Sequence, residues 1–510
     1  MNAASSNRRS PFFRWLLRGA VVLGTTITMA AGAAPAFADE SHFRGSLGGG
    51  LSGTVLAAGL ISLAVVFAVL VGWRRILDRR VAAVGAAAAG GAPMGYREAI
   101  RGFSPNAKLF LAYALLAELG SGIWSVMFNL YLLAVGFPIS FVGAFWFINM
   151  LCHGIGALPA GMIGDRFGRR RAFVIATLVA VTAELGLLFT MEPLLIICLA
   201  AVSGFGDAFH GVTGTPFMMD NSEAHERAHL FSIHGSFQQV SRFVGNLSGG
   251  WLPLAWALVI GIPDVDPNVA RIALISGLPL TVLALTPLAF MREKELEFVG
   301  SLKDLVLLRN VTHMDIVVRF TLLSVMTGAA FGLTIRFFNV FFNQGLGASG
   351  SEVGTILAMG SVAGSASILV APLMVQSWGK VKSLVFTQLA SIPFLLAMAF
   401  VPSMSFVTGM FLARGAISSI GRPLSNQLQM EFIDRNERGT TAGFTHTAFD
   451  IGGGIGAGLA GMLVLDGDFS VTFGAAALLI AVPAILYYTW FYRLERGERA
   501  EAPVTAPALA

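Results

Sequence analysis

The sequence predicts an all-α membrane protein made of two six-helix bundles, with one additional transmembrane helix near the N-terminus. Three observations predict this fold: an apolar composition, a series of long apolar segments, and an uneven distribution of basic residues. Of the 510 residues, 55% are hydrophobic and only 12% are charged, whereas a soluble protein carries about 25% charged residues. We therefore expect a multi-pass protein in a lipid bilayer. We interpret its basic charge as a property of its loops and expect no nucleic-acid partner.

The N-terminal segment is expected to lie outside the bundles. Residues 1–38 have the layout of a secretory signal peptide, with arginines before an apolar stretch and small residues at Ala36 and Ala38. An uncleaved signal anchor is the alternative. Residues 51–73 are long enough to span a bilayer and are followed by "RRILDRR" (74–80), which predicts an extra transmembrane helix with a cytoplasmic end. Residues 74–107 then form a cytoplasmic linker.

Twelve further apolar spans follow, and each is long enough to cross the membrane. They cover residues 108–134, 140–163, 172–190, 194–219, 229–260, 270–291, 315–343, 352–376, 383–401, 404–430, 439–464 and 471–492.

The basic residues test this arrangement. If residue 74 is cytoplasmic, every second connection is cytoplasmic, and the segments so assigned hold 23 Lys and Arg residues. The opposite connections hold none apart from Arg271 at a helix edge. Because loops rich in Lys and Arg stay inside, this split predicts that both ends of the twelve-helix unit are cytoplasmic. The protein is then expected in a bacterial plasma (inner) membrane.

An internal repeat divides the spans into two halves. The charged block at Asp165 between spans two and three is matched by "SWGKVKS" (377–383) between spans eight and nine. Glu226-Arg227 is matched about 211 residues later by Glu437-Arg438. We therefore expect bundles at 108–291 and 315–492, a cytoplasmic connector at 292–314 and a cytoplasmic tail at 493–510.

The block "GMIGDRFGRRR" resembles the loop 2–3 signature of the major facilitator superfamily. The matching residues are Gly161, Asp165, Arg166, Gly168, Arg169 and Arg170. The resemblance covers about residues 108–492 and implies a transporter whose two bundles rock about a central site. It also implies that Asp165 forms a conformational latch with a helix N-terminus or an arginine. The alternative is that the arginines only anchor the topology.

A second family motif is weaker. The antiporter motif of this superfamily reads Gly-Pro-x-x-Gly-Gly at its core, and "GNLSGG" (245–250) supplies the three glycines with Asn246 in place of proline. The motif favours export. Small residues at these positions also serve ordinary helix packing.

Polar residues at membrane depth are the candidates for function, because each is costly there unless it is paired or wetted. In the superfamily, helices one, four, seven and ten line the central cavity, and the resemblance places Glu118, Asp207, His210, Arg336 and Arg414 there. The other candidates for proton coupling or the substrate cavity are Asn129, Arg242, Asn339, Arg422, His446 and Asp450. Glu118 and Asp207 are the first candidates for carrying a proton.

Some of these residues also have purely structural interpretations. Arg242 is a candidate partner for Asp207 or Glu118. His153 is interpreted as a hydrogen-bonded core histidine, and the two cysteines as small buried apolar residues.

We expect a monomeric secondary transporter that exports a small organic or amphipathic compound and is driven by protons. Uptake of an organic anion is the alternative, suggested by Arg336, Arg414 and Arg422. A transporter-derived membrane sensor or assembly subunit is a third hypothesis. We expect no enzymatic activity, cofactor or metal ion, because no phosphate-binding loop or metal-ligand spacing is present in the sequence.

Overall fold

The computed structural model describes residues 100–223, 226–292, 314–368, 370–433, 438–464 and 467–501. The predicted signal peptide, helix 51–73 and most of the linker and connector lie outside these residues. Inside them, helices occupy every one of the twelve predicted spans, which confirms the all-α fold.

The first half begins at Pro105, where Ser104 accepts a hydrogen bond from the first helical turn. Its helices are α4 (Pro105–Ala134), α5 (Ile139–Phe167), α6 (Arg169–Phe189), α7 (Pro193–Asp220), α8 (Arg227–Ile260), α9 (Pro267–Leu283) and the short α10 (Leu285–Phe290).

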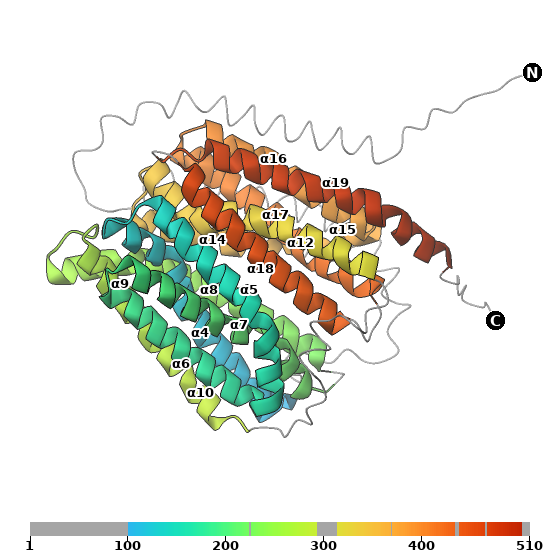
Figure 1. Ribbon diagram of the computed structural model, residues 1–510, viewed down its shortest axis with the longest axis horizontal. Coiled ribbons are helices and arrows are strands. Elements are labelled where there is room, and N and C mark those ends of the chain that lie inside the picture. The colour runs from blue at the N-terminus through green and yellow to red at the C-terminus, as the bar shows by residue number, and fades with distance from the viewer. Residues whose placement is uncertain are drawn as a thin grey trace, which may run out of the picture. The chain divides into compact units, whose positions relative to one another are not determined.

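The second half repeats this order, but its first span is broken. That span runs through α12 (Met314–Thr334), the 3₁₀ turn η3 (Ile335–Phe337), α13 (Phe338–Val340) and the π turn η4 (Phe341–Gly345). The remaining helices are α14 (Gly350–Ile368), α15 (Ala371–Trp378), α16 (Lys380–Phe400), α17 (Met404–Phe432), α18 (Arg438–Leu463) and α19 (Ser470–Glu501). Figure 1 colours the first half blue to yellow-green and the second half yellow to red.

Among the described residues, nine helices are long and apolar enough to cross a membrane, or ten if the bent pair α14 and α15 forms one span. α17 and α18 have the length but carry more polar residues, so their crossing of the membrane stays a prediction. Large apolar side chains are exposed on the outer surface, including Leu258 at 80%, Phe400 at 73% and Leu194 at 71%. Such a surface suits lipid and is costly in water.

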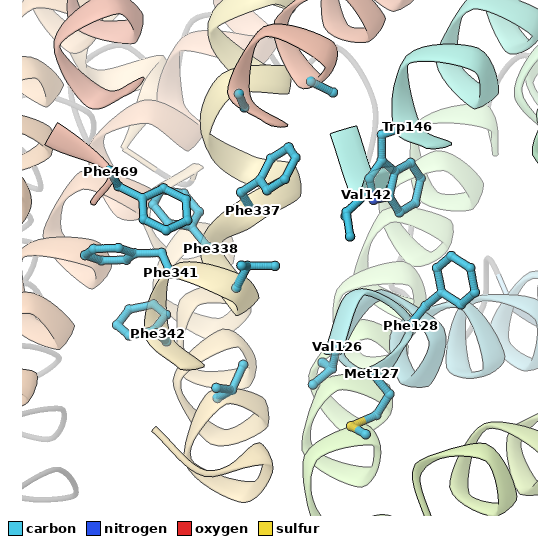
Figure 2. Packing of buried hydrophobic residues seen from close by; sticks show 14 of the residues in the cluster. Val126, Met127, Phe128, Val142, Trp146, Phe337, Phe338, Phe341, Phe342 and Phe469 are labelled. Atoms are coloured by element: carbon cyan, nitrogen blue, oxygen red, sulfur yellow. The ribbon is translucent and has the colours of Figure 1, made fainter. Parts of the chain in front are cut away.

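Three large apolar clusters hold the helices together. One cluster takes residues from both halves, including Phe128 and Phe145 of the first half and Phe338 and Phe473 of the second. Figure 2 shows part of it: Val126, Met127, Phe128, Val142 and Trp146 come from the first half, and Phe337, Phe338, Phe341, Phe342 and Phe469 from the second. We call this end of the protein the shared end.

The other two clusters each belong to a single half. One contains Phe110, Phe173 and Phe217 of the first half, and the other contains Phe320, Tyr487 and Phe491 of the second. They lie toward the end that carries Gly168 and Gly379, which we call the split end. The two halves therefore share a core at one end and keep separate cores at the other.

Close backbone contacts at glycines bring the helices together. A Cβ atom at Gly122 of α4 would lie 2.7 Å from the Cα atom of Gly245 of α8. Between the halves, a Cβ atom at Gly250 would lie 2.7 Å from the Cα atom of Gly354. Inside the second half, a Cβ atom at Gly332 of α12 would overlap the backbone oxygen of Gly453 of α18. Small residues let membrane helices approach this closely.

We expect Gly332→Ala to lower the stability of the second half, because the added methyl group forces α12 and α18 apart. Overpacking of this kind costs about 1–3 kcal/mol, measured as a lower midpoint of thermal unfolding in detergent. The matched control is Gly474→Ala in α19, where a Cβ atom meets nothing within 4 Å. Alanine there should be neutral or stabilising, and equal midpoints for the two variants would contradict the packing argument.

Candidate functional site

Two asparagines join the halves at the shared end. Nδ2 of Asn129 in α4 donates to Oδ1 of Asn339 in α13 at 3.0 Å and to the backbone oxygen of Arg336 at 2.7 Å. Nδ2 of Asn339 donates in return to the backbone oxygens of Ser125 and Val126, at 3.3 and 2.9 Å. Each side-chain amide thus donates to a backbone oxygen of the opposite helix, about one turn before the asparagine on that helix. We call this nearly symmetric arrangement the asparagine clasp.

Trp146 and Arg336 surround the clasp. Nε1 of Trp146 donates to Oδ1 of Asn129 at 2.8 Å, and Cζ of Arg336 lies 4.0 Å from the centre of the Trp146 ring. Arg336 belongs to the 3₁₀ turn that interrupts the span, and such a turn within a helix often marks a functional hinge. The broken span therefore meets the first half through a cation–π contact and the clasp.

Glu118 and Arg242 form an ion pair between α4 and α8. Nε of Arg242 lies 3.2 Å from Oε2 of Glu118, and Nε2 of Gln238 donates to Oε1 at 3.0 Å. The Glu118 side chain is 20% exposed and that of Arg242 is 52% exposed. Of the two partners that the sequence suggested for Arg242, the structure shows Glu118.

A second acidic group lies between the halves. Oδ2 of Asp450 in α18 is 2.9 Å from Nδ1 of His153 in α5 and 3.0 Å from Nδ1 of His446. His153 is indeed hydrogen-bonded, but its partner belongs to the other half. Among the described residues, these three form a group with the ligand types and spacing to hold a metal ion. Sequence spacing did not reveal it, because His153 and Asp450 are 297 residues apart.

Asp207 and His210 share a helical face in sequence but have different surroundings. His210 contacts the Tyr113 hydroxyl through Nδ1, and the two rings are stacked at 5.8 Å. Asp207 has no hydrogen-bond partner among the described residues, although it interacts electrostatically with His153 and Arg336. Asp207 is thus the candidate carboxylate without a direct partner in the described structure.

The two arginines of α17 differ in exposure. Arg414 is only 5% exposed, its Nε atom has no hydrogen-bond partner among the described residues, and Cζ lies 5.2 Å from the Phe338 ring centre. Arg422 is exposed, with Cζ 5.9 Å from the Phe449 ring centre. A buried guanidinium without a carboxylate is unusual, since burying a charge is costly.

The loop that carries the family signature separates α5 from α6 at Gly168, whose φ of 96° favours glycine. The side chains of Asp165 and Arg166 and the surroundings of Gly161 lie outside the described set, so the Asp165 latch stays a prediction. Arg169 forms an ion pair with Asp220 at the end of α7. Arg170 donates to the backbone oxygens of Leu288 and Ala289 in α10. These contacts join helices of the same half.

The second half contains the counterpart of this ion pair. Gly379 has a φ of 85°, and the following Lys380 pairs with Glu431 near the end of α17. In both halves the basic and acidic partners are 51 residues apart. Sequence reasoning missed Asp220 and Glu431, although this repeated separation was a signal that could have found them.

The glycines of "GNLSGG" all pack against neighbouring helices. Gly245 and Gly249 face α4, and Gly250 faces α14 of the other half. Asn246 donates to the hydroxyl of Ser361 in α14 at 3.3 Å. This stretch therefore has a clear packing role.

Comparison with known proteins places the chain in a family. The sequence profile of the Major Facilitator Superfamily matches residues 109–457 and 320–509. Inositol transporter 4 of Arabidopsis thaliana is 28% identical over 128 residues, which cover 24% of this chain and 22% of that protein. The match thus spans about a fifth of that relative's length.

Solved structures share the fold. Nucleoside transporter NupG has a TM-score of 0.58 at 15% identity, over 76% of this chain and 99% of that chain. A D-xylose-proton symporter has a TM-score of 0.58 at 15% identity, over 78% and 98% of the two chains. An inward-facing, unoccupied bacterial homolog of the lysosomal transporter Spinster has a TM-score of 0.59 at 14% identity, over 79% and 99%. Because the profile match runs through both halves of a fold common to these transporters, the chain belongs to the Major Facilitator Superfamily.

Proposed function

We propose that this chain is a proton-coupled secondary transporter that exports a small organic compound across the bacterial inner membrane as a monomer, by alternating access. The observation that carries this proposal is the arrangement of the three apolar clusters. The two halves share an apolar core at one end and have separate cores at the other. This arrangement is expected of a carrier that is closed at the shared end and open at the split end. If the split end is cytoplasmic, as the basic residues predict, the conformation is inward-facing.

Alternation then requires the shared end to open. The contacts to be broken include the asparagine clasp, the hydrogen bond from Asn246 to Ser361, and the glycine contacts between α8 and α14. The separate clusters and the two ion pairs at the split end lie within single halves, so each half can move as a rigid unit.

Coupling to protons is assigned first to Asp207. A carboxylate at membrane depth is costly when charged and unpaired, and Asp207 has no hydrogen-bond partner among the described residues. Glu118 is held by Arg242 and Gln238, which favours a structural role as a charge partner.

The direction of transport rests on the sequence. Export is favoured by the glycine spacing of residues 245–250, and those glycines also have the packing role described above. Uptake of an organic anion is the second candidate, and a specific observation favours an anion. Neither Arg336 nor Arg414 has a carboxylate partner within hydrogen-bonding distance in the described part of the chain.

We expect Asn339→Ala to shift the protein toward the state that is open at the shared end. Leaving buried hydrogen-bonding groups unpaired costs about 1–3 kcal/mol, which is about 5–150-fold in the conformational equilibrium. The reporter is Ser351→Cys, a position 5% exposed at the shared end, in a chain with Cys152 and Cys198 replaced by serine. Its labelling by a thiol reagent should accelerate about tenfold.

The control for this shift is Asn343→Ala. Asn343 donates at 2.7 Å to the backbone oxygen of Ala348 in its own half, so its loss should leave the labelling rate unchanged. Equal labelling rates for Asn339→Ala and the parent would show that the asparagine clasp does not hold the shared end closed.

We expect Asp207→Asn to abolish transport driven by a pH gradient in proteoliposomes while sparing substrate binding and exchange without a gradient. The asparagine amide cannot bind and release a proton as a carboxylate does. Full pH-driven transport by Asp207→Asn would show that another group carries the proton. Absence of flux for every compound tested in the parent would instead favour the sensor or assembly hypothesis.

The comparison for Asp207 is Glu118→Gln, which leaves Arg242 without its partner. We expect lower stability, because breaking a partly buried pair exposes an uncompensated charge. The double variant Glu118→Gln with Arg242→Gln should recover stability. Recovery of the fold together with pH-driven transport would establish that this pair is structural.

Organic anions should raise the unfolding midpoint of the purified protein if the second candidate is correct. A ligand at about 100 times its Kd stabilises by about 2.7 kcal/mol. Arg336→Gln and Arg414→Gln should each reduce this stabilisation. The control is Arg319→Gln, because Arg319 pairs with Asp315 on its own helix. Stabilisation by neutral compounds alone would exclude an anionic substrate.

A further inference from the structure

Three side chains from the two halves meet at one carboxylate oxygen. Nδ1 of His153 and Nδ1 of His446 both lie against Oδ2 of Asp450, at 2.9 and 3.0 Å. His153 comes from α5, and the other two come from adjacent turns of α18. All three donor atoms lie within 4.8 Å of one another.

Two imidazole nitrogens and one carboxylate oxygen are a ligand set for first-row divalent metal ions, including Zn²⁺. With bonds of about 2.0–2.1 Å, tetrahedral ligands are separated by about 3.3 Å. The two separations between a histidine nitrogen and the Asp450 oxygen need to grow by only a few tenths of an ångström. A metal ion would replace the two Nδ1 protons now shared with the carboxylate.

The exposure of the three side chains allows an ion to reach them. His446 is 57% exposed, whereas Asp450 is 8% and His153 is 20% exposed. A site with three protein ligands and one exposed side also leaves a coordination position for water.

The second nitrogen of His153 faces α7. A Cβ atom at Gly211 would lie 3.7 Å from Nε2 of His153, and Asp207, one turn earlier on α7, interacts electrostatically with this histidine. A carboxylate near the outer nitrogen of a metal-binding histidine strengthens the ligand.

Charges of both signs surround the three donors. Arg336 and Arg422 both interact electrostatically with Asp450, and Asp207 offsets part of their positive charge. Two guanidinium groups weaken a dication site, so the affinity should be lower than that of a closed structural zinc site.

We propose that His153, His446 and Asp450 bind a divalent transition-metal ion that staples α5 to α18. Because the ligands come from opposite halves, the ion is held only while these helices are in contact at this depth. Bound metal therefore favours the conformation described here and stops alternation. This proposal rests on the alternating-access part of the proposed function and does not depend on the identity of the substrate.

The test uses the purified full chain and Zn²⁺, with Co²⁺ as a spectroscopic probe. Zn²⁺ should raise the unfolding midpoint, and Co²⁺ should give the visible absorption of a low-coordinate nitrogen and oxygen site. His153→Gln, His446→Gln and Asp450→Asn should each weaken Zn²⁺ binding by more than the roughly 10–100-fold that loss of an outer ligand partner causes. The control His234→Gln should bind normally, since His234 stacks on Phe110 away from the three donors.

A rescue variant separates ligation from folding. His446→Cys restores a zinc ligand without restoring the imidazole hydrogen bond, so it should bind Zn²⁺ where His446→Gln does not. Unchanged Zn²⁺ binding in all three ligand variants, or none in the parent, would overturn the site.

The conformational effect has its own readout. Zn²⁺ should slow thiol labelling of the Ser351→Cys reporter, and a chelator should reverse this effect. When His446→Gln is added to the reporter, Zn²⁺ should leave the labelling rate unchanged. Neither measurement requires transport, so the site can stand even if the proposed function fails. Binding without slower labelling, or transport of Zn²⁺ itself, would overturn the staple.

Discussion

A primary amide at membrane depth must find hydrogen-bond partners within the protein, because hydrocarbon offers none and an unpaired polar group costs several kcal/mol. Asn129 and Asn339 satisfy this requirement across the boundary between the halves. Trp146 and Arg336 then take their positions around the two amides. The shared apolar cluster closes over the same region. Opening this end removes hydrogen-bond partners from both asparagines at once. The clasp therefore raises the free energy needed to open the shared end.

The halves are braced by a different device. In each half a glycine with positive φ immediately precedes the helix of the third span. The next residue forms an ion pair near the end of the helix of the fourth span. The first-half pair ties α6 to α7 and the second-half pair ties α16 to α17. Because these ties lie inside the halves and the clasp lies between them, one set of contacts can persist while the other breaks.

Hydropathy and charge were sufficient to predict a helix in each span, because burial in lipid imposes a long apolar segment on each. They did not predict the interruption of the span at 315–343 by 3₁₀ and π turns. They also selected Asn129, Asn339 and Asp450 as candidates, since polar residues stand out at membrane depth. They did not reveal which residues meet. The contact of His153 with Asp450 joins residues 297 positions apart, and no local period encodes it. The different environments of Asp207 and His210 likewise depend on Tyr113, which belongs to another helix.

The position of Trp146 has an optical consequence. Its indole donates to Asn129 and lies beneath the guanidinium of Arg336, a residue of the other half. When the shared end opens, the ring loses the cation of the other half and meets a different solvent, whereas its hydrogen bond to Asn129 lies within the first half. Indole emission responds to the loss of the cation and to the change of solvent. The chain contains 8 tryptophans, so the contribution of this one is obtained by difference from a Trp146→Phe variant. Its emission then provides an intrinsic fluorescent reporter of which side of the carrier is open, without any attached label.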